Sequence, residues 1–260
     1  MTTRCVLCRS WQIQLVESIR ARDIVRLYSR SLGINVSGEL HNVDILGLYA
    51  CGDCGCRFFS PLLAGSEAFY EELQKLEWYY LKDKVEYEFA RKFVRPSDRI
   101  LEVGCGSGLF ADKVDSCNYV GLEFSPKAAE LAREKGLVVY NEAVEDHALR
   151  FTQHYDVVCA FQVLEHVPDA RSFIEACLKC LRPRGILIYS VPSADSFITM
   201  STNCALNVPP HHLTWWSDQC LQHIAKLFGL NLLSLDHEKV SAIHRKWYIH
   251  TIAVQIVGRM

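Results

Sequence analysis

A short apolar run leads into a glycine-rich turn at residues 101–108, Leu-Glu-Val-Gly-Cys-Gly-Ser-Gly, and this turn constrains the fold more than any other feature of the chain. Glycines at alternate positions let the backbone come close to a ligand directly after a strand. Open α/β sheets bind ligands at this place, beyond the carboxyl ends of their strands. The turn therefore predicts a Rossmann-like α/β domain that holds a ligand over residues 104–108.

The pattern that follows the turn supports this fold class. From Arg99 onward, short β-rich runs alternate with helical patterns. This alternation is typical of a mostly parallel sheet with helices on both faces. The expected strands are 100–103, 119–123, 137–140, 155–160 and 185–191, and the expected helices are 111–115, 126–134, 169–181 and 217–228. Two later apolar runs, 230–235 and 247–257, are expected to complete the sheet.

The residues before Arg99 have a different character. Residues 67–93 place apolar side chains at helical spacing, which predicts one long amphipathic helix. Residues 11–32 also look helical, up to Gly33, and lie between two cysteine pairs. We therefore expect three parts, which are a small Cys-bearing module at 1–60, a linking amphipathic helix at 61–95 and a large α/β domain at 96–260.

Two carboxylates help to distinguish the ligands that such a turn can bind. Glu123 ends the β-run about twenty residues after the turn, where a carboxylate can accept both hydroxyls of a ribose. Glu102 would repel a pyrophosphate, but it suits the positively charged amino acid part of S-adenosylmethionine. The turn also departs from the dinucleotide fingerprint, because Gly106 and Gly108 are two positions apart and not three. These features favour S-adenosylmethionine over a nicotinamide cofactor.

Several motifs occur together in the order of a known family. Residues 102–108, 121–123, 155–158, 163–167 and 181–185 resemble the motifs of class I S-adenosylmethionine-dependent methyltransferases, in their ubiquinone-type and small-molecule branch. The resemblance covers residues 91–257 and implies a seven-stranded sheet with an antiparallel last strand. It implies methyl transfer to a nucleophile, with oxygen favoured, on a small molecule, sugar or lipid-linked intermediate. An NAD(P)-dependent oxidoreductase and a non-catalytic binding protein that keeps this fold are the alternatives.

The resemblance also assigns cofactor contacts to positions of this chain. The expected contacts are Glu102, Gly104 and Gly106 at the methionine part, Glu123 with the adjoining Phe124 at the ribose, Asn141, Glu142, Ala143 and Val144 beside the adenine, and Phe161 and Gln162 in the pocket wall. One departure is Arg184, where the family usually has glycine.

Other polar residues near these motifs have simpler explanations. Asp156 and Glu165 are interpreted as structural acids, at a strand end and a helix start respectively. His166 is interpreted as a structural imidazole at the same helix start. Cys105 is expected to be inert, because no activating base for its thiol is identifiable.

Two pairs of cysteines suggest a metal site near the N-terminus. Cys5 with Cys8 and Cys51 with Cys54 have the spacing of metal-binding knuckles, and together they supply four ligands for tetrahedral zinc. A cytosolic setting would keep the thiols reduced, which favours structural zinc over disulfides. Cys56 is a spare candidate ligand. Cys177 and Cys180 have the same spacing but lie on a predicted amphipathic helix, where core packing explains them better.

Residues 192–216 form a long connection after the fifth expected parallel strand. Long ordered connections are usually functional. This one carries Pro-Pro-His-His-Leu at 209–213, and His211 and His212 are candidate general bases, because imidazole titrates near neutrality. Trp215 and Trp216 are expected to be buried packing residues.

Composition narrows the class of partner. The net charge is −2, without the basic excess typical of nucleic-acid-binding surfaces. No apolar run is long enough to cross a bilayer, and the first residues do not look like a signal peptide. We therefore expect a cytoplasmic enzyme that acts on a small-molecule, glycan or lipid-linked acceptor, with no nucleic acid partner.

Overall fold

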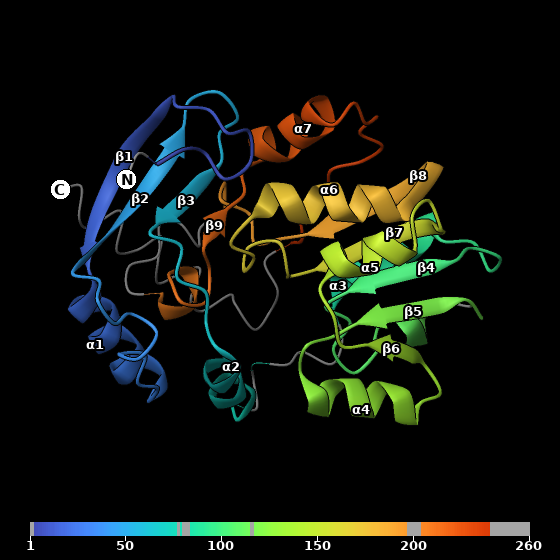
Figure 1. Ribbon diagram of the computed structural model, residues 1–260, viewed down its shortest axis with the longest axis horizontal. Coiled ribbons are helices and arrows are strands. Elements are labelled where there is room, and N and C mark those ends of the chain that lie inside the picture. The colour runs from blue at the N-terminus through green and yellow to red at the C-terminus, as the bar shows by residue number, and fades with distance from the viewer. Residues whose placement is uncertain (1–2, 77–78, 80–83, 115–116, 197–203, 240–260) are drawn as a thin grey trace. The chain divides into compact units, whose positions relative to one another are not determined.

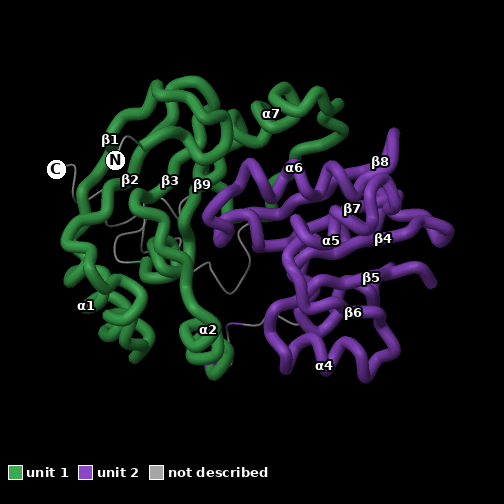
Figure 2. The backbone as a smooth tube through the Cα atoms, viewed as in Figure 1, with its two compact units in different colours: residues 1–75, 192–260 green, residues 76–191 purple. Residues whose placement is uncertain are grey.

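The computed structural model describes residues 3–76, 79, 84–114, 117–196 and 204–239 (Figure 1). The chain divides into two compact units (Figure 2). Residues 76–191 form the central unit, and residues 1–75 together with 192–260 form the terminal unit. The terminal unit thus combines segments from both ends of the chain.

The central unit is built on a five-stranded parallel sheet with the strand order β6-β5-β4-β7-β8. Its strands are β4 (Ile100–Val103), β5 (Tyr119–Leu122), β6 (Val138–Tyr140), β7 (Tyr155–Phe161) and β8 (Leu181–Ser190). Every residue of β4 and β7 is buried, as expected for strands covered on both faces. The chain moves outward from β4 to β6 and then returns beside β4 as β7. The carboxyl ends of β4 and β7 therefore meet at a topological switch point, where such sheets bind ligands.

Short helices accompany this sheet (Figure 1). They are α3 (Val85–Ala90), η1 (Arg91–Phe93), η2 (Ala111–Lys113), α4 (Pro126–Glu134), α5 (Val144–Arg150) and α6 (Ala170–Cys180). Ser125 caps α4 by accepting a hydrogen bond from the Ala128 N–H, and Pro126 occupies the first turn. Cys177 and Cys180 are fully buried on α6, which confirms their role in packing.

The terminal unit contains a four-stranded antiparallel sheet with the order β1-β2-β3-β9. Its elements are β1 (Ile13–Arg20), α1 (Ala21–Leu32), β2 (Ile45–Cys51), β3 (Arg57–Ser60), α2 (Glu67–Gln74), η4 (Ala205–Asn207), β9 (Thr214–Trp215) and α7 (Asp218–Leu227). β9 pairs with β3, and the Tyr28 hydroxyl donates to the Val208 carbonyl at 2.9 Å. Trp216 is fully buried, as expected. These contacts join N-terminal segments to residues 208–215 within the terminal unit.

The five expected parallel strands between residues 100 and 191 are confirmed, with shifted limits at some ends. β8 begins at Leu181, four residues before the expected start at 185. The expected helix 126–134 has the limits of α4, whereas the described residues of the expected helix 111–115 form the short 3₁₀ turn η2. Within the described residues, no helix combines the length and the apolar character needed to cross a membrane.

The single long helix expected at 67–93 is wrong. α2 ends at Gln74, α3 begins at Val85, and Lys84 between them is extended, with φ −117°. Phe69 packs against Tyr28 in the terminal unit, whereas Tyr87 belongs to the core of the central unit. Helical spacing continues across the break because both segments have apolar faces, but these faces are buried in different cores.

Two other expectations also need correction. Residues 11–32 are only partly helical, because 13–20 form β1 and pair with β2, and α1 then ends at Gly33, as expected. Residues 230–235 have no regular secondary structure, and Leu233 is 66% exposed. A strand requires a partner to satisfy its backbone, so apolar composition alone does not create one. The described part of the central sheet therefore has five strands rather than seven, and residues 247–257 lie outside the described residues.

Candidate cofactor site and cysteine cluster

The glycines of the turn between β4 and η2 are required for different reasons. Gly104, Gly106 and Gly108 all have left-handed φ values, of 73°, 55° and 74°. A Cβ atom at Gly104 would lie 2.5 Å from Val163 Cγ2, and one at Gly108 would lie 2.3 Å from Leu137 Cδ1, so protein packing excludes side chains at both positions. Apart from its chain neighbours, a Cβ atom at Gly106 would meet no atom of the described residues within 4 Å. Gly106 therefore borders open space that a ligand can occupy.

Glu123 connects the end of β5 to this turn. Its Oε2 accepts a hydrogen bond from the Gly106 N–H at 2.8 Å, and its Oε1 accepts one from the Ser125 N–H at 2.7 Å. A carboxylate offers about four acceptor sites, so these two bonds do not exhaust its capacity. Asn141 donates to the carbonyls of Glu123 and Phe124 at 2.9 and 2.8 Å, and the Phe124 side chain is 67% exposed. The carboxylate can thus also accept hydrogen bonds from a ribose.

Glu102 is a buried carboxyl group with an unsatisfied oxygen. The side chain is 1% exposed, and its Oε2 accepts a hydrogen bond from the Tyr119 hydroxyl. Its Oε1 has no hydrogen-bond partner in the part of the chain that the structure describes. Burial raises the pKa of Glu102 to about 8, although the Tyr119 hydrogen bond opposes the rise. A buried oxygen without a partner is costly, so a cationic ligand would relieve a defect that the fold already contains.

Glu165 has a buried environment that its sequence position did not predict. It is not a helix-start acid, because α6 begins at Ala170 and is capped by Asp169, whose side chain accepts from the Ser172 N–H. Glu165 lies in the preceding turn, is 1% exposed, and neither carboxyl oxygen has a hydrogen-bond partner among the described residues. His166 Nε2 is 3.7 Å from Oε1, which is too long for a hydrogen bond. The only sequence signal was its position after β7, close to the switch point.

Burial also raises the pKa of Glu165 to about 8, from 4.5. The folded protein therefore favours the neutral acid. The stability of the fold that depends on a neutral Glu165 is fully present below the unfolded pKa of 4.5, and it is lost as the pH rises through the folded pKa of about 8. We expect Glu165→Gln to raise the melting temperature of the ligand-free protein by roughly 5 °C or more at about pH 8, with little change near pH 5. Equal melting temperatures of variant and parent at both pH values, measured by calorimetry, would contradict this explanation.

Asp156 has the structural role expected for it. Its carboxylate accepts from the Arg99 N–H at 2.7 Å and forms ion pairs with the guanidinium groups of Arg182 and Arg99. Partial burial opposes ionisation, but these contacts prevail and lower the pKa of Asp156. The carboxylate thus links the starts of β4, β7 and β8.

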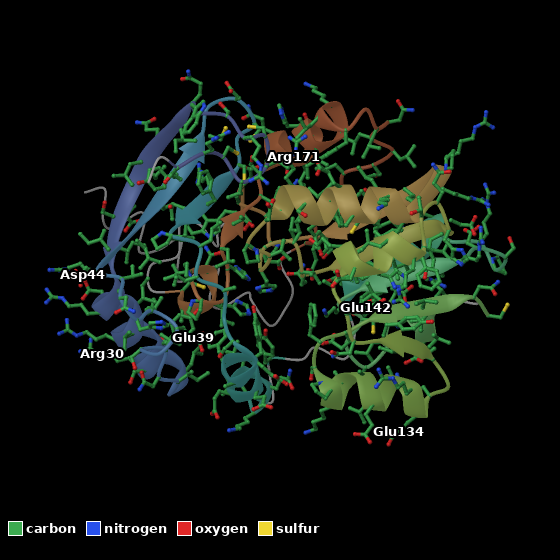
Figure 3. The ribbon with its side chains drawn as sticks, viewed as in Figure 1. Arg30, Glu39, Asp44, Glu134, Glu142 and Arg171 are labelled. Atoms are coloured by element: carbon green, nitrogen blue, oxygen red, sulfur yellow. The ribbon has the colours of Figure 1, made fainter. Side chains whose placement is uncertain are left out.

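The expected adenine segment lies between β6 and α5, where Figure 3 labels Glu142. The Glu142 carboxylate contacts His147 Nδ1 at 2.6 Å and also binds Arg150. Partial burial opposes ionisation, but His147 and Arg150 together lower the pKa of Glu142. Ala143 is the N-cap of α5, and Val144 is buried. These contacts fix the start of α5 beside the end of β6.

The two expected residues after β7 differ in environment. Phe161 is 3% exposed and packs against Tyr87 and Phe110, with ring centroids 5.0 and 4.8 Å away. Gln162 has a left-handed φ of 58°, and its Nε2 donates to Ser190 Oγ at 2.7 Å. Strained backbone of this kind is common at functional sites. The ends of β4, β5 and β7 thus bring Glu102, Glu123 and Gln162 to one edge of the sheet.

His211 and His212 belong to the terminal unit. Both are buried, and their rings stack with centroids 4.6 Å apart. His211 Nδ1 donates to the Leu206 carbonyl at 2.9 Å, and His212 Nδ1 is 3.2 Å from Asn207 Oδ1. These bonds place the proton on Nδ1, which makes Nε2 the basic nitrogen of each ring.

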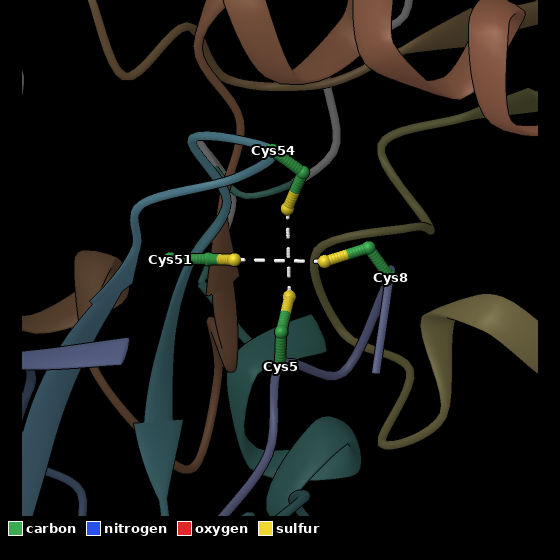
Figure 4. A group of neighbouring side chains, drawn as sticks. All are labelled: Cys5, Cys8, Cys51 and Cys54. Atoms are coloured by element: carbon green, nitrogen blue, oxygen red, sulfur yellow. Dashed lines mark hydrogen bonds between the residues drawn. The ribbon is translucent and has the colours of Figure 1, made fainter. Parts of the chain in front are cut away.

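The four cysteines predicted to bind metal converge in the terminal unit (Figure 4). Their Sγ atoms all lie within 4.8 Å of one another, and Cys5–Cys54 and Cys8–Cys51 are each 3.5 Å apart. Four sulfurs around a zinc ion, with bonds of about 2.3 Å, would be about 3.8 Å apart. The donor set, its geometry and its burial therefore fit a tetrahedral metal.

The fold and the edge built by Glu102, Gly106 and Glu123 define a class I S-adenosylmethionine-dependent methyltransferase. A family model described as a methyltransferase domain matches residues 70–235, and the chain belongs to this family. The predictions of fold class and of an S-adenosylmethionine-dependent enzyme are thereby confirmed.

Relatives agree with this assignment. The chain is 37% identical over 179 residues to a ubiquinone biosynthesis O-methyltransferase of Yersinia pestis, covering 59% of this chain and 74% of that protein. The enzyme of the same name from Klebsiella pneumoniae is 29% identical, with 60% and 76% covered. The match to the Erwinia tasmaniensis enzyme is 36% identical but spans 38% of this chain and 44% of that protein. A solved S-adenosylmethionine-dependent methyltransferase from Archaeoglobus fulgidus shares the fold, with a TM-score of 0.53, 16% identity and coverage of 71% and 92%.

Proposed function

We propose that this protein transfers the methyl group of S-adenosylmethionine to an oxygen atom of a small-molecule, glycan or lipid-linked acceptor. The assignment of the cofactor rests mainly on the Oε1 atom of Glu102, which has no hydrogen-bond partner among the described residues. This atom lies at the same edge of the sheet as the open space beside Gly106. The choice of oxygen is supported by the relatives, which are named ubiquinone biosynthesis O-methyltransferases.

The residues at this edge suit the parts of the cofactor. Glu102 would neutralise the ammonium group of the methionine part, and Glu123 would accept hydrogen bonds from the ribose hydroxyls. Gly106 would allow the backbone to approach the ligand without a side chain between them. When bound, S-adenosylmethionine supplies an electrophilic methyl group on a sulfonium. The protein's own contribution would be to align the acceptor with this methyl group and to exclude water.

The reaction can be tested directly with methyl-labelled S-adenosylmethionine and a cytosolic metabolite extract. We expect label in a product that is one methyl group heavier than its acceptor and that resists alkaline hydrolysis, as an ether does. A labelled product with the methyl group on nitrogen or carbon would overturn the choice of oxygen. If no fraction of the extract yields a labelled product and all label remains in S-adenosylmethionine, the proposed transfer is overturned.

The affinity for S-adenosylmethionine should depend on pH through Glu102. The ammonium group of the ligand favours the ionised carboxylate, whose pKa without ligand is about 8. The affinity should therefore rise from about pH 5.5 to about pH 7.5, by up to tenfold per pH unit, with proton release on binding.

Titration calorimetry in buffers of different ionisation enthalpy measures both the affinity for S-adenosylmethionine and the number of protons released on binding. Glu102→Gln should bind more weakly and lose this pH dependence. Glu165→Gln is the matched control, because Glu165 has the same raised pKa but no assigned ligand contact. A pH dependence that persists in Glu102→Gln would show that another group binds the ammonium.

We further propose that Cys5, Cys8, Cys51 and Cys54 hold structural zinc. The proposal is supported by the convergence of four thiols with tetrahedral spacing. A site closed by four thiolates has no open position for a substrate, so the metal would stabilise the terminal unit rather than take part in methyl transfer. Elemental analysis that finds no metal in protein purified without chelator would remove this assignment.

A further inference from the structure

The outer face of α1 carries three arginines in a row. Arg22, Arg26 and Arg30 follow one another at four-residue spacing, which places them on one face of the helix. All three are exposed, and Figure 3 labels Arg30. Ile24 and Tyr28 on the opposite face of the helix are buried. The helix thus presents a cationic face to solvent.

This arrangement of charges is unfavourable for the helix itself. Like charges four residues apart repel each other, and the row contains two such pairs. Arg22 also lies in the first turn, where the helix dipole disfavours a cation. Asp23 offsets part of this cost through ion pairs with Arg20 at 3.0 Å and Arg26 at 3.3 Å, but no acid lies three or four positions from Arg22 or Arg30. An anionic partner would offset the remaining repulsion.

A groove with apolar walls adjoins this cationic face within the terminal unit. It has a volume of about 490 Å³, and its lining includes Arg20, Arg22, Val25, Leu40, Val43 and Ile45. Asp44 also lines the groove, so the two arginines there are only partly balanced. Ile45, at the start of β2, is 57% exposed. Cations and exposed apolar side chains thus lie side by side on one surface.

Charge is segregated along the chain in the same way. Residues 1–32 contain six arginines and two acids, a formal charge of +4, whereas residues 33–260 carry −6. Every cationic side chain of residues 1–32 is an arginine, and the first lysine of the chain is Lys75. A guanidinium group can donate two parallel hydrogen bonds to one phosphate, whereas an ammonium group acts as a point charge. The type of residue, as well as its charge, therefore suits a partner that carries phosphate groups.

We propose that the groove and the row Arg22, Arg26 and Arg30 together bind the anionic phospholipids of a membrane surface. The arginines contact lipid phosphates, and Ile45 with the apolar wall of the groove contacts the upper parts of the acyl chains. The apolar wall favours a lipid over a nucleic acid, because the backbone of a nucleic acid offers phosphates without acyl chains.

This surface is separate from the methyltransferase site. Its residues lie outside the range 70–235 that the methyltransferase domain family model matches, so the docking does not depend on the proposed methyl transfer. An ordinary solvated helix face is the competing explanation. Such a face would not distinguish an anionic membrane from a neutral one.

Co-sedimentation of the full chain with lipid vesicles tests this proposal. The protein should bind vesicles of phosphatidylcholine mixed with phosphatidylglycerol, and it should not bind vesicles of phosphatidylcholine alone. Salt screens the attraction between exposed charges, so binding should weaken as sodium chloride is added. Equal binding to the two kinds of vesicle, or binding to neither, would overturn the proposal.

Substitutions locate the binding surface. The triple variant Arg22→Gln, Arg26→Gln, Arg30→Gln should bind the anionic vesicles about 100-fold more weakly, since each arginine near an anionic lipid surface contributes about a factor of five. Arg91→Gln, Lys92→Gln, Arg95→Gln is the matched control, because it removes three exposed cations from the central unit, and it should bind as the parent does. Both variants should keep the affinity for S-adenosylmethionine, so a failure of docking is distinguishable from a failure of the proposed methyl transfer. Equal losses of vesicle binding in the two variants would show that net charge, and not this surface, attracts the lipid.

A second pair of variants separates a membrane from other polyanions. Ile45→Ser should weaken vesicle binding several-fold, because it removes apolar surface that the acyl chains would cover. Val138→Ser is the matched control, at a position of the central unit that is 51% exposed, and it should leave vesicle binding unchanged. Duplex DNA should bind more weakly than the anionic vesicles, and its binding should not respond to Ile45→Ser. Duplex DNA that binds as tightly as the vesicles would overturn the assignment of a lipid partner.

Discussion

Replacing Gly106 with alanine is expected to raise the Kd for S-adenosylmethionine by at least about tenfold, which corresponds to about 1.4 kcal/mol of binding free energy. The Cβ atom would enter a space that none of the residues described by the structure occupies, and we assign this space to the cofactor. A larger side chain, as in Gly106→Val, should abolish measurable binding.

A second glycine of the central unit provides the control. Gly136 also has a left-handed φ, of 84°, and in the described part of the chain a Cβ atom there would likewise meet nothing within 4 Å beyond its chain neighbours. Gly106→Ala and Gly136→Ala should therefore lose similar amounts of stability, about 1 kcal/mol each from backbone strain. Only Gly106→Ala should lose affinity for the cofactor. If titration calorimetry shows equal affinities for the two variants, the open space at Gly106 does not hold the ligand.

Asparagine in place of His211 or His212 is expected to lower turnover by about 10²–10⁴ if that imidazole accepts the proton of the acceptor hydroxyl. The Nδ1 contacts with Leu206 and Asn207 leave Nε2 as the basic nitrogen, which a general base requires. The affinity for S-adenosylmethionine should change little in such a variant. The acidic limb of the pH–rate profile should disappear, because it reports protonation of this base.

A purely structural histidine would give a different pattern. Its loss would lower the melting temperature and weaken the binding of both ligands, and the acidic limb would remain. His41→Asn, at an exposed position, controls for a general effect of losing an imidazole. Turnover within a factor of about two of the parent in both single variants would rule out a base at this position and leave alignment alone to explain the rate.

Local signals explain why much of the central unit could be predicted. The glycine turn and the β-rich runs predicted the positions of five strands along the chain, and the two central strands, β4 and β7, are mostly apolar because every residue in them is buried. The limits of α4 were predictable, because Ser125 and Pro126 start the helix through neighbouring residues alone. Arg184 has a left-handed φ of 65°, a conformation that glycine adopts more readily than other residues.

Non-local contacts explain what the sequence did not reveal. Residues 13–20 form a strand because β2 pairs with them, and the two apolar segments on either side of Lys84 belong to different units. Glu165 looked like a helix-start acid, since nothing in its neighbours showed that both oxygens would be buried without hydrogen bonds.

Equilibrium binding tests the central claim, that the edge formed by Glu102, Gly106 and Glu123 holds S-adenosylmethionine. Calorimetric titration of the full chain with S-adenosylmethionine should show one site per chain, and NADH should show no binding under the same conditions. Glu123→Ala should weaken S-adenosylmethionine binding by about tenfold or more, because a carboxylate that accepts ribose hydroxyls contributes charge-assisted hydrogen bonds of roughly 1.5–3 kcal/mol each. Binding of NADH without binding of S-adenosylmethionine, or an unchanged affinity in Glu123→Ala, would contradict the account.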